Sequence, residues 1–255
     1  MNRVASLAYG VVTYTIFFAT FLYTIGFLGN FGVPKTIDSG SAIPVVQAVL
    51  VNLGLLALFA LQHSVMARQG FKAWWTRIVP RQIERSTYVL ATCVALGLLF
   101  WLWQPLPSAV WSVQEPALRT LAWGLFGVGL ATVLYSTFLI DHFDLFGLRQ
   151  VVLYFREHEY SEKRFSTPSL YRFIRHPLYV GWFITFWATP DMSAGRLLLA
   201  AVSTAYILVA IVFEERDLSQ LLGEEYRSWR SRTPMFVPRL RRSAPEHTLS
   251  TAESR

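Results

Sequence analysis

The chain has 255 residues, 53% of them hydrophobic and 15% charged, with a positive mean hydropathy; this excludes a disordered chain and disfavours an ordinary soluble domain, in which about 25% of residues are charged. Its single cysteine, Cys93, excludes a disulfide scaffold and a metal site made of cysteines alone. In so apolar a chain, the net charge of +7 is typical of loops that face anionic lipid rather than of a nucleic-acid-binding protein.

Four apolar runs are long enough to cross a bilayer, because a spanning helix needs about 20 mostly apolar residues. They occupy residues 4–28, 43–67, 87–103 and 118–140. The first run is too long for the apolar region of a signal peptide, and no small-residue cleavage site follows it. We therefore expect it to be a retained helix.

Two further apolar runs follow a polar stretch and are expected to form a hairpin. Residues 178–189 are too few to cross a bilayer unaided, whereas residues 196–213 form a long run. Pro190-Asp191 marks the turn between them. The predicted fold class is therefore all-α: a polytopic integral membrane helix bundle with four full-length spans and a C-terminal helical hairpin.

The basic residues are distributed very unequally between the two sides of this bundle. Twenty of the 23 Lys and Arg residues lie at Arg3 or in the segments 68–86, 141–177 and 214–255. The three on the other side are Lys35, Arg119 and Arg196. Cytoplasmic loops of membrane proteins carry the excess of basic residues, so both termini are predicted to be cytoplasmic.

Several common catalytic motifs are absent from the sequence. There is no dinucleotide fingerprint, phosphate-binding loop, Gly-x-Ser-x-Gly elbow or His-Glu-x-x-His zinc motif. No two of the five histidines are three or four residues apart, so no metal is expected. Gly124, Gly127 and Gly129 lie within an apolar run, where small residues are expected to permit close helix packing.

Polar groups at membrane depth or at the ends of the runs are candidate functional residues, because they are costly there. Gln62-His63-Ser64 lies near the cytoplasmic end of the second run. Its alternative interpretation is a hydrogen-bonded cluster that packs helices. Asp141-His142-Phe143-Asp144 ends the fourth run, where the alternative is a solvated helix end.

A third polar cluster precedes the hairpin. Pro177 suits the first turn of a helix, so Arg175 and His176 should lie just outside that helix, beside its free amide groups. Such a site can bind an anion such as a carboxylate. Glu214 and Glu215 are expected to end the last helix, close to this site, where they could accept hydrogen bonds from a diol or an amino group; the alternative is a charged helix end that only stops translocation.

These residues resemble the signature of the isoprenylcysteine carboxyl methyltransferase and phospholipid methyltransferase superfamily. The signature reads Arg-His-Pro-Leu-Tyr-Val-Gly over residues 175–181, followed by Glu214-Glu215 and an aromatic tail that ends at Val237-Pro238, with Trp229 where the family commonly has Tyr. The resemblance covers about residues 167–238. It implies S-adenosyl-L-methionine as methyl donor, bound from the cytosol, and an acceptor held in a tunnel open to the bilayer. The expected cofactor-binding residues are Gln150, Tyr171, Arg175, His176, Leu178, Tyr179, Gly181, Glu214 and Glu215.

Motifs in the front half of the chain narrow the resemblance from the superfamily to one group within it. Residues 33–40, 62–64, 74–77, 84–88 and 141–143 resemble the bacterial methanethiol S-methyltransferases, over about residues 1–240, and the NnrU-type membrane proteins. This implies methylation of a small thiol, methanethiol to dimethyl sulfide, in a bacterial cell (inner) membrane. The alternatives are a methyltransferase for a lipid or prenyl-type acceptor and a non-enzymatic NnrU-type membrane protein.

The implied reaction needs a thiolate, and an alkanethiol is mostly protonated at neutral pH. The candidates for the base are His63, His142 and Asp141. We expect Ser64 or Asp141 to orient the His63 ring; a mechanism without a protein base, in which the sulfonium stabilises the thiolate, is the alternative.

Three regions are expected along the chain. Residues 1–140 should form a four-helix transmembrane region, and residues 141–242 a methyltransferase core with a cytoplasmic loop, the helical hairpin and a cofactor-binding cap. Residues 243–255 are polar and should be a disordered tail. The expected partners are the thiol acceptor and membrane lipid, without nucleic acid or metal.

Overall fold

The computed structural model describes residues 1–161 and 165–238; the predicted tail lies outside the described residues. In these residues, five helices are long and apolar enough to cross a membrane, so the chain is a polytopic all-α integral membrane protein, as predicted. The five helices are α1 (Arg3–Gly29), α2 (Val45–Ala67), α4 (Arg81–Leu102), α5 (Pro116–Ile140) and α9 (Ala194–Leu221).

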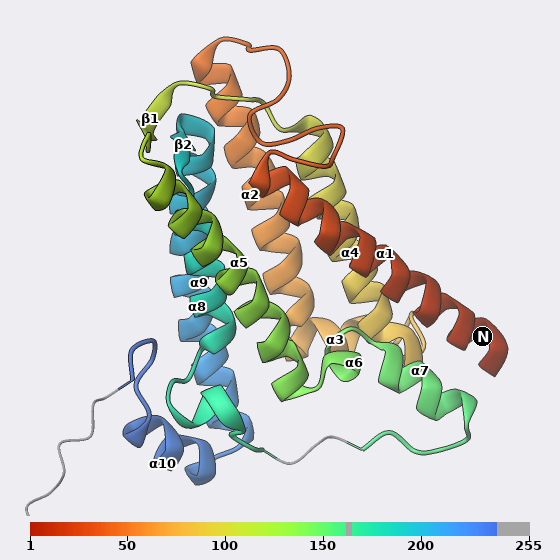
Figure 1. Ribbon diagram of the computed structural model, residues 1–255. Coiled ribbons are helices and arrows are strands. Elements are labelled where there is room, and N and C mark those ends of the chain that lie inside the picture. Colours follow the sequence, from red (N-terminus) through yellow and green to blue (C-terminus); the bar gives the residue numbers. More distant parts are fainter. Residues whose placement is uncertain (162–164, 239–255) are drawn as a thin grey trace, which may run out of the picture.

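Shorter elements gather at the two ends of this bundle (Figure 1). One end, here called the strand end, carries the α1–α2 loop and an antiparallel pair of strands, β1 (Ala109–Ser112) and β2 (Asp191–Ser193). The opposite end, the cap end, carries the other short elements. They are α3 (Gln69–Trp75), α6 (His142–Leu145), α7 (Leu148–Phe155), the 3-10 turn η1 (Ser169–Arg172) and α10 (Glu224–Arg232), with the start of α8 (Pro177–Trp187) beside them.

The apolar side chains divide between a core and the bundle surface. Phe27, Leu99 and Trp103 are buried in one cluster where α1, α4 and the α1–α2 loop meet. Other large apolar side chains face outwards, among them Val46 at 73% exposure and Leu121 at 57%. So much exposed apolar surface would be unfavourable in water and suits contact with lipid chains.

The short helix α8 packs mainly along α5 and less along α9. Two glycines make this approach possible: a Cβ on Gly129 would lie 2.8 Å from the Gly181 carbonyl oxygen, and a Cβ on Gly181 would lie 2.8 Å from that of Gly129. The prediction of close packing is therefore confirmed for Gly129. It is wrong for Gly124 and Gly127, where an added Cβ would meet no atom within 4 Å.

The last spanning helix is longer than predicted. α9 continues past residue 213 to Leu221, so Glu214 and Glu215 lie inside the helix and do not end it. Glutamate is a good helix former, so the two charges do not end the helix; Glu215 is paired with arginines from other segments, described below. The β1–β2 pair is also an addition to the prediction; it joins the α4–α5 loop to the turn that precedes α9.

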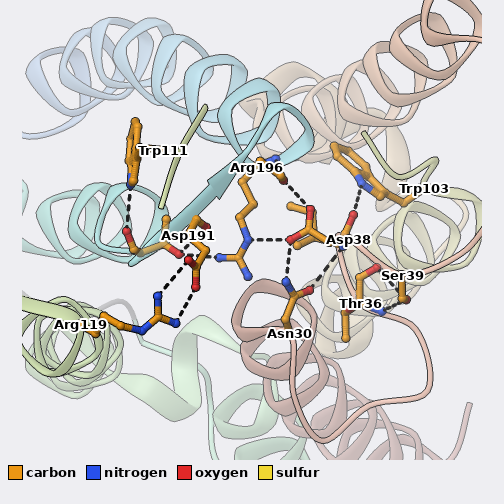
Figure 2. A network of polar contacts seen from close by, with 12 residues as sticks. Asn30, Thr36, Asp38, Ser39, Trp103, Trp111, Arg119, Asp191 and Arg196 are labelled. Atoms are coloured by element: carbon orange, nitrogen blue, oxygen red, sulfur yellow. Dashed lines mark hydrogen bonds and ion pairs between the residues drawn. The ribbon is translucent and has the colours of Figure 1, made fainter. Parts of the chain in front are cut away.

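A polar network locks the strand end (Figure 2). Asp38 of the α1–α2 loop accepts hydrogen bonds from Asn30 Nδ2 at 2.6 Å, from Arg196 Nε at 3.0 Å and from the Ser193 hydroxyl. Arg196, 8% exposed, also donates to the Thr189 hydroxyl at 3.0 Å. The network therefore ties the α1–α2 loop to the start of α9.

An ion pair between Arg119 and Asp191 ties the strand end to α5 (Figure 2). Arg119 on α5 donates to both carboxylate oxygens of Asp191 on β2, at 3.0 and 2.8 Å. These hydrogen bonds, with one from the Ser112 hydroxyl, lower the pKa of Asp191 below its ordinary value. Both residues are partly exposed, so the pair fixes the loop more than it adds stability.

Candidate active site

Glu215 ties α9 to the start of α8 and to α10. Its Oε1 lies 2.7 Å from Nε of Arg175 and 3.0 Å from Nε2 of His176, and its Oε2 lies 2.9 Å from Nε of Arg230. Arg175 also donates to the carbonyl oxygens of Arg230 and Thr233. Glu215 is 3% exposed. Arg175 and His176 thus bind Glu215, where the sequence suggested an external anion, and we call these residues the Glu215 cluster.

Glu214, the preceding residue, has a different environment. The Tyr179 hydroxyl donates to its Oε2 at 2.7 Å, while its Oε1 has no hydrogen-bond partner within residues 1–161 and 165–238. Tyr171 of η1 is also affected by this carboxylate: burial and the charge of Glu214 both raise the pKa of the Tyr171 hydroxyl. Of the two glutamates, Glu214 is therefore the one that retains a free acceptor.

The first turn of α8 supplies free donors next to Glu214. His176 is the N-cap and Pro177 the first helical residue. The amides of Leu178 and Tyr179 have no hydrogen-bond acceptor in the described chain, as expected of a helix N-terminus without a side-chain cap. Such amides, together with the helix dipole, favour a carboxylate or phosphate.

The cap end contributes three aromatic rings and two buried polar atoms that have no hydrogen-bond partner in the described residues. Phe165, Tyr226 and Trp229 pack with ring centroids 5.4–5.9 Å apart. The Tyr226 hydroxyl and Trp229 Nε1 are buried and without a hydrogen-bond partner in the described residues. Burial, assisted by Glu215, raises the pKa of Tyr226 to about 12. Such atoms also occur elsewhere in the described residues, for example at Gln62 and Gln150, but these two share one aromatic cluster and so suit a ligand with a planar ring and polar edges.

His63 lies on α2 and is oriented by Tyr88 of α4. The Tyr88 hydroxyl is 3.0 Å from both ring nitrogens, and the ring stacks on Phe59 with centroids 5.3 Å apart. The prediction that Ser64 or Asp141 orients this ring is wrong. Ser64, one residue further along the helix, faces α9 and bonds the Tyr206 hydroxyl at 3.1 Å.

Three tyrosine hydroxyls lie near His63 or Glu214. Tyr88, Tyr179 and Tyr206 come from α4, α8 and α9, and the Tyr179 hydroxyl interacts electrostatically with the other two and with Glu214. Tyr88 bonds His63, Tyr206 bonds Ser64 beside it, and Tyr179 bonds Glu214, so these hydroxyls lie on facing sides of α2, α4, α8 and α9. No local sequence pattern marks these tyrosines as a group, because tyrosines in apolar runs are ordinarily packing residues; their only signal is the cost of a buried hydroxyl.

His142 and Asp141 lie elsewhere, between α1 and α5. The His142 ring is 2.8 Å from the hydroxyls of both Tyr14 and Thr137, one at each nitrogen, and stacks on Phe138. Burial lowers its pKa, against an opposing effect of Asp141. Since both nitrogens are engaged, His142 is poorly suited to accept a proton. Asp141 Oδ1 caps α6 by accepting the Asp144 amide.

Two other predicted cofactor residues have local roles. Gln150 on α7 donates to the Asp144 carbonyl at 3.1 Å, in the same group as Asp141. Gly181 faces α5, where its lack of a side chain admits Gly129. The structure thus brings Tyr171, Arg175, His176, Leu178, Tyr179, Glu214 and Glu215 together and leaves Gln150, Asp141 and His142 in a separate cluster.

Known proteins resemble this chain along most of its length. A family model described as NnrU protein matches residues 51–235. The chain is 54% identical to a methanethiol S-methyltransferase of Mycobacterium tuberculosis, over 93% of this chain and 98% of that protein, and 51% identical to one of Crocosphaera subtropica, over 93% of each. It is 30% identical to nurim of Sus scrofa, over 87% of this chain and 88% of nurim. No solved structure matches the chain.

Proposed function

The chain belongs to the NnrU protein family and, within it, to the methanethiol S-methyltransferases, and from this premise we propose that it methylates methanethiol with S-adenosylmethionine. The thiol loses its proton, its sulfur forms a bond to the donor's methyl carbon, and the carbon–sulfur bond of the donor breaks. The products are dimethyl sulfide and S-adenosylhomocysteine. The observation that carries the proposal is the set of unpaired acceptor and donor groups around Glu214.

These groups fit S-adenosylmethionine. When bound, the donor supplies a reactive methyl group on a positively charged sulfur. Glu214 Oε1 is free to accept hydrogen bonds from the ribose hydroxyls or the amino group. The amides of Leu178 and Tyr179 suit its carboxylate. Trp229 Nε1 and the Tyr226 hydroxyl lie in an aromatic cluster that suits an adenine ring and its polar edge.

The Glu215 cluster has a positioning role in this proposal. It fixes Arg175 and His176 against α9 and the cap, so the first turn of α8 stays aligned with Glu214. Positioning of both reactants can supply several kcal/mol of the lowered barrier. The tight packing of α8 on α5 through Gly129 and Gly181 supports the same alignment.

His63 is the base in this proposal. A cysteine thiol has a pKa of about 8.5 and a simple alkanethiol should lie higher, so few acceptor molecules are ionised at neutral pH. The Tyr88 hydroxyl can bond only one ring nitrogen of His63 at a time. The Thr92 hydroxyl lies 3.4 Å from Nδ1, so Nε2 is the nitrogen that can take the proton from the thiol when Tyr88 also bonds Nδ1. The stacked Phe59 helps to keep water from this side of the site.

We propose that the protein lies in the cell membrane of a bacterium, with the cap end facing the cytoplasm. The described parts of the segments rich in Lys and Arg lie at this end, as the positive-inside rule requires of a cytoplasmic face. The donor would then enter from the cytosol, while a small neutral thiol can reach the site through the bilayer.

The direct test is an assay of the purified protein. Protein in detergent is incubated with S-adenosylmethionine and methanethiol, and dimethyl sulfide is measured in the headspace. We expect turnover with methanethiol and none with a prenylated cysteine or a phospholipid as the acceptor. Binding of S-adenosylmethionine without turnover of methanethiol would favour another acceptor, and absence of binding would favour a non-enzymatic role.

A further inference from the structure

A basic cavity lies outside the proposed active site, between α9 and α10. Its volume is about 550 Å³, and it is lined by Val212, Arg216, Ser219, Gln220, Gly223, Arg227 and Arg230. The α9 residues of this set share one face of the helix, because they are spaced by about one or two turns. Glu214 is two positions from both Val212 and Arg216 and therefore points to the opposite face. The cavity and the proposed donor site thus lie on different sides of α9.

The charges in this cavity are mostly positive. Arg216 is exposed and makes no ion pair in the described residues. Arg227 pairs with Glu224, whose side chain is 86% exposed, and such surface pairs open at little cost. Arg230 uses Nε for Glu215, which leaves its terminal nitrogens for another acceptor. Three guanidinium groups can therefore turn towards one anion.

The turn between the two helices shapes the opening. Gly223 has φ 59 and ψ −132, a conformation that favours glycine. A Cβ added there would meet no atom within 4 Å, so the turn leaves the side of the cavity open. This geometry admits a headgroup from the side of the bundle as well as an ion from solution.

An apolar stripe leads along α9 into this cavity. Leu208, Val209 and Val212 are 45%, 56% and 67% exposed, and the small residues Ala201 and Ala205 on the same face are exposed too. Small side chains between larger ones make a shallow path along a helix. The stripe therefore offers an acyl chain a surface that ends at the arginines.

We propose that this cavity binds the phosphate headgroup of an anionic phospholipid, whose acyl chain lies along the stripe on α9. Arginine forks bind phosphate oxygens in pairs, and basic residues just beyond a membrane span attract anionic lipids. A free phosphate would use the same arginines, but the continuous apolar stripe favours a lipid. The lipid would join α9 to α10 and so hold the cap against the membrane.

The test compares two pairs of arginines in detergent-purified protein. Arg216→Ala with Arg227→Ala removes charge from the cavity, and Arg77→Ala with Arg81→Ala removes the same charge from exposed positions elsewhere at the cap end. Binding of phosphatidylglycerol, phosphatidylcholine and inorganic phosphate is titrated by native mass spectrometry and by the shift in Tm. We expect phosphatidylglycerol to bind preferentially, and the cavity pair to weaken it about tenfold or more while the control pair binds normally.

Three results would overturn the proposal. They are unchanged phosphatidylglycerol affinity in the cavity pair, an equal loss in both pairs, and phosphate binding as tight as that of the lipid, which would mark a free-anion site. Arg216→Ala alone, which breaks no ion pair in the described residues, gives a milder variant should the double one fold poorly. S-adenosylmethionine binding should be unchanged in all of them, so the lipid site and the proposed function fail separately.

Discussion

Arg196 at the strand end and Glu215 at the cap end are both buried charges held by opposite charges from distant segments. Arg196 binds Asp38 and Thr189, and Glu215 binds two arginines and a histidine. The two ends differ in what surrounds these pairs. Around Glu215 lie a free carboxylate oxygen, free amides and orphan aromatic donors, whereas the groups around Arg196 bind one another.

This difference distinguishes polar groups that hold the fold together from polar groups that can bind a ligand. A closed network such as that of Asp38 and Arg196 can only hold loops together, because an added ligand would have to break bonds already made. A site that binds a ligand must keep donors and acceptors unpaired at a cost in stability. The neighbours Glu214 and Glu215 show the same contrast within one helix turn.

The largest expected effect is on stability, at the strand end. Arg196→Ala leaves Asp38, whose side chain is 23% exposed, without its cation, so we expect a cost of about 3 kcal/mol, the lower end of the range for a buried pair. We expect a lower Tm in detergent, followed by tryptophan fluorescence. The affinity of the folded fraction for S-adenosylmethionine should be unchanged.

Arg119→Ala is the matched control, since Arg119 and Asp191 form a partly exposed pair. Its loss should cost about 1 kcal/mol or less. A loss of stability as large as that of Arg196→Ala would contradict the distinction between the buried network and the surface pair.

The next effect is on turnover, at the cap end. His63→Ala should lower turnover about 10²-fold, the usual scale for a general base, with little change in donor affinity. Turnover should recover in part as the pH rises, because the thiol then ionises in solution. His158→Ala, at an exposed histidine, should behave as wild type. A wild-type rate with a flat pH profile in His63→Ala would make His63 a packing residue.

The smallest effect is an acid dependence at the strand end. The pKa of Asp191 is lowered in the folded protein, mainly by Arg119, so its pair stabilises the fold above the ordinary carboxyl pKa of about 4 and is lost as the pH falls below it. Asp191→Asn should lower the stability at pH 7 by about 1 kcal/mol or less and by a smaller amount at pH 3, because the stabilisation fades as the pH falls towards the lowered pKa of the folded state. Equal destabilisation at both pH values would show a loss of shape rather than of charge.

The sequence predicted the spans well because lipid leaves few options: a segment that crosses must be a long apolar helix. It predicted the start of a helix at Pro177 because that signal is local. It failed where partners come from far along the chain. That Glu215 would pair with Arg175 and Arg230 depends on contacts that no pattern around Glu215 reveals.

The same limit applies to individual site residues. His63 was found from its cost at membrane depth, but its partner Tyr88 lies on another helix. Gly181 belongs to a cofactor-like motif, yet its position against Gly129 is set by the α5–α8 crossing. Residue type suggested candidates, and only the packing of helices decided which of them share a site.

The most direct test of the account is the affinity for S-adenosylmethionine of Glu214→Gln and Glu215→Gln, measured by calorimetry alongside Tm. Glu214→Gln weakens an acceptor that the fold leaves free, so we predict a loss of affinity of about tenfold or more, the scale of one charged hydrogen bond, with Tm unchanged. Glu215→Gln should lower Tm, because Arg175 and Arg230 lose the carboxylate that pairs with them and His176 loses its partner. Wild-type affinity in Glu214→Gln would contradict the assignment of the donor site to the cap end.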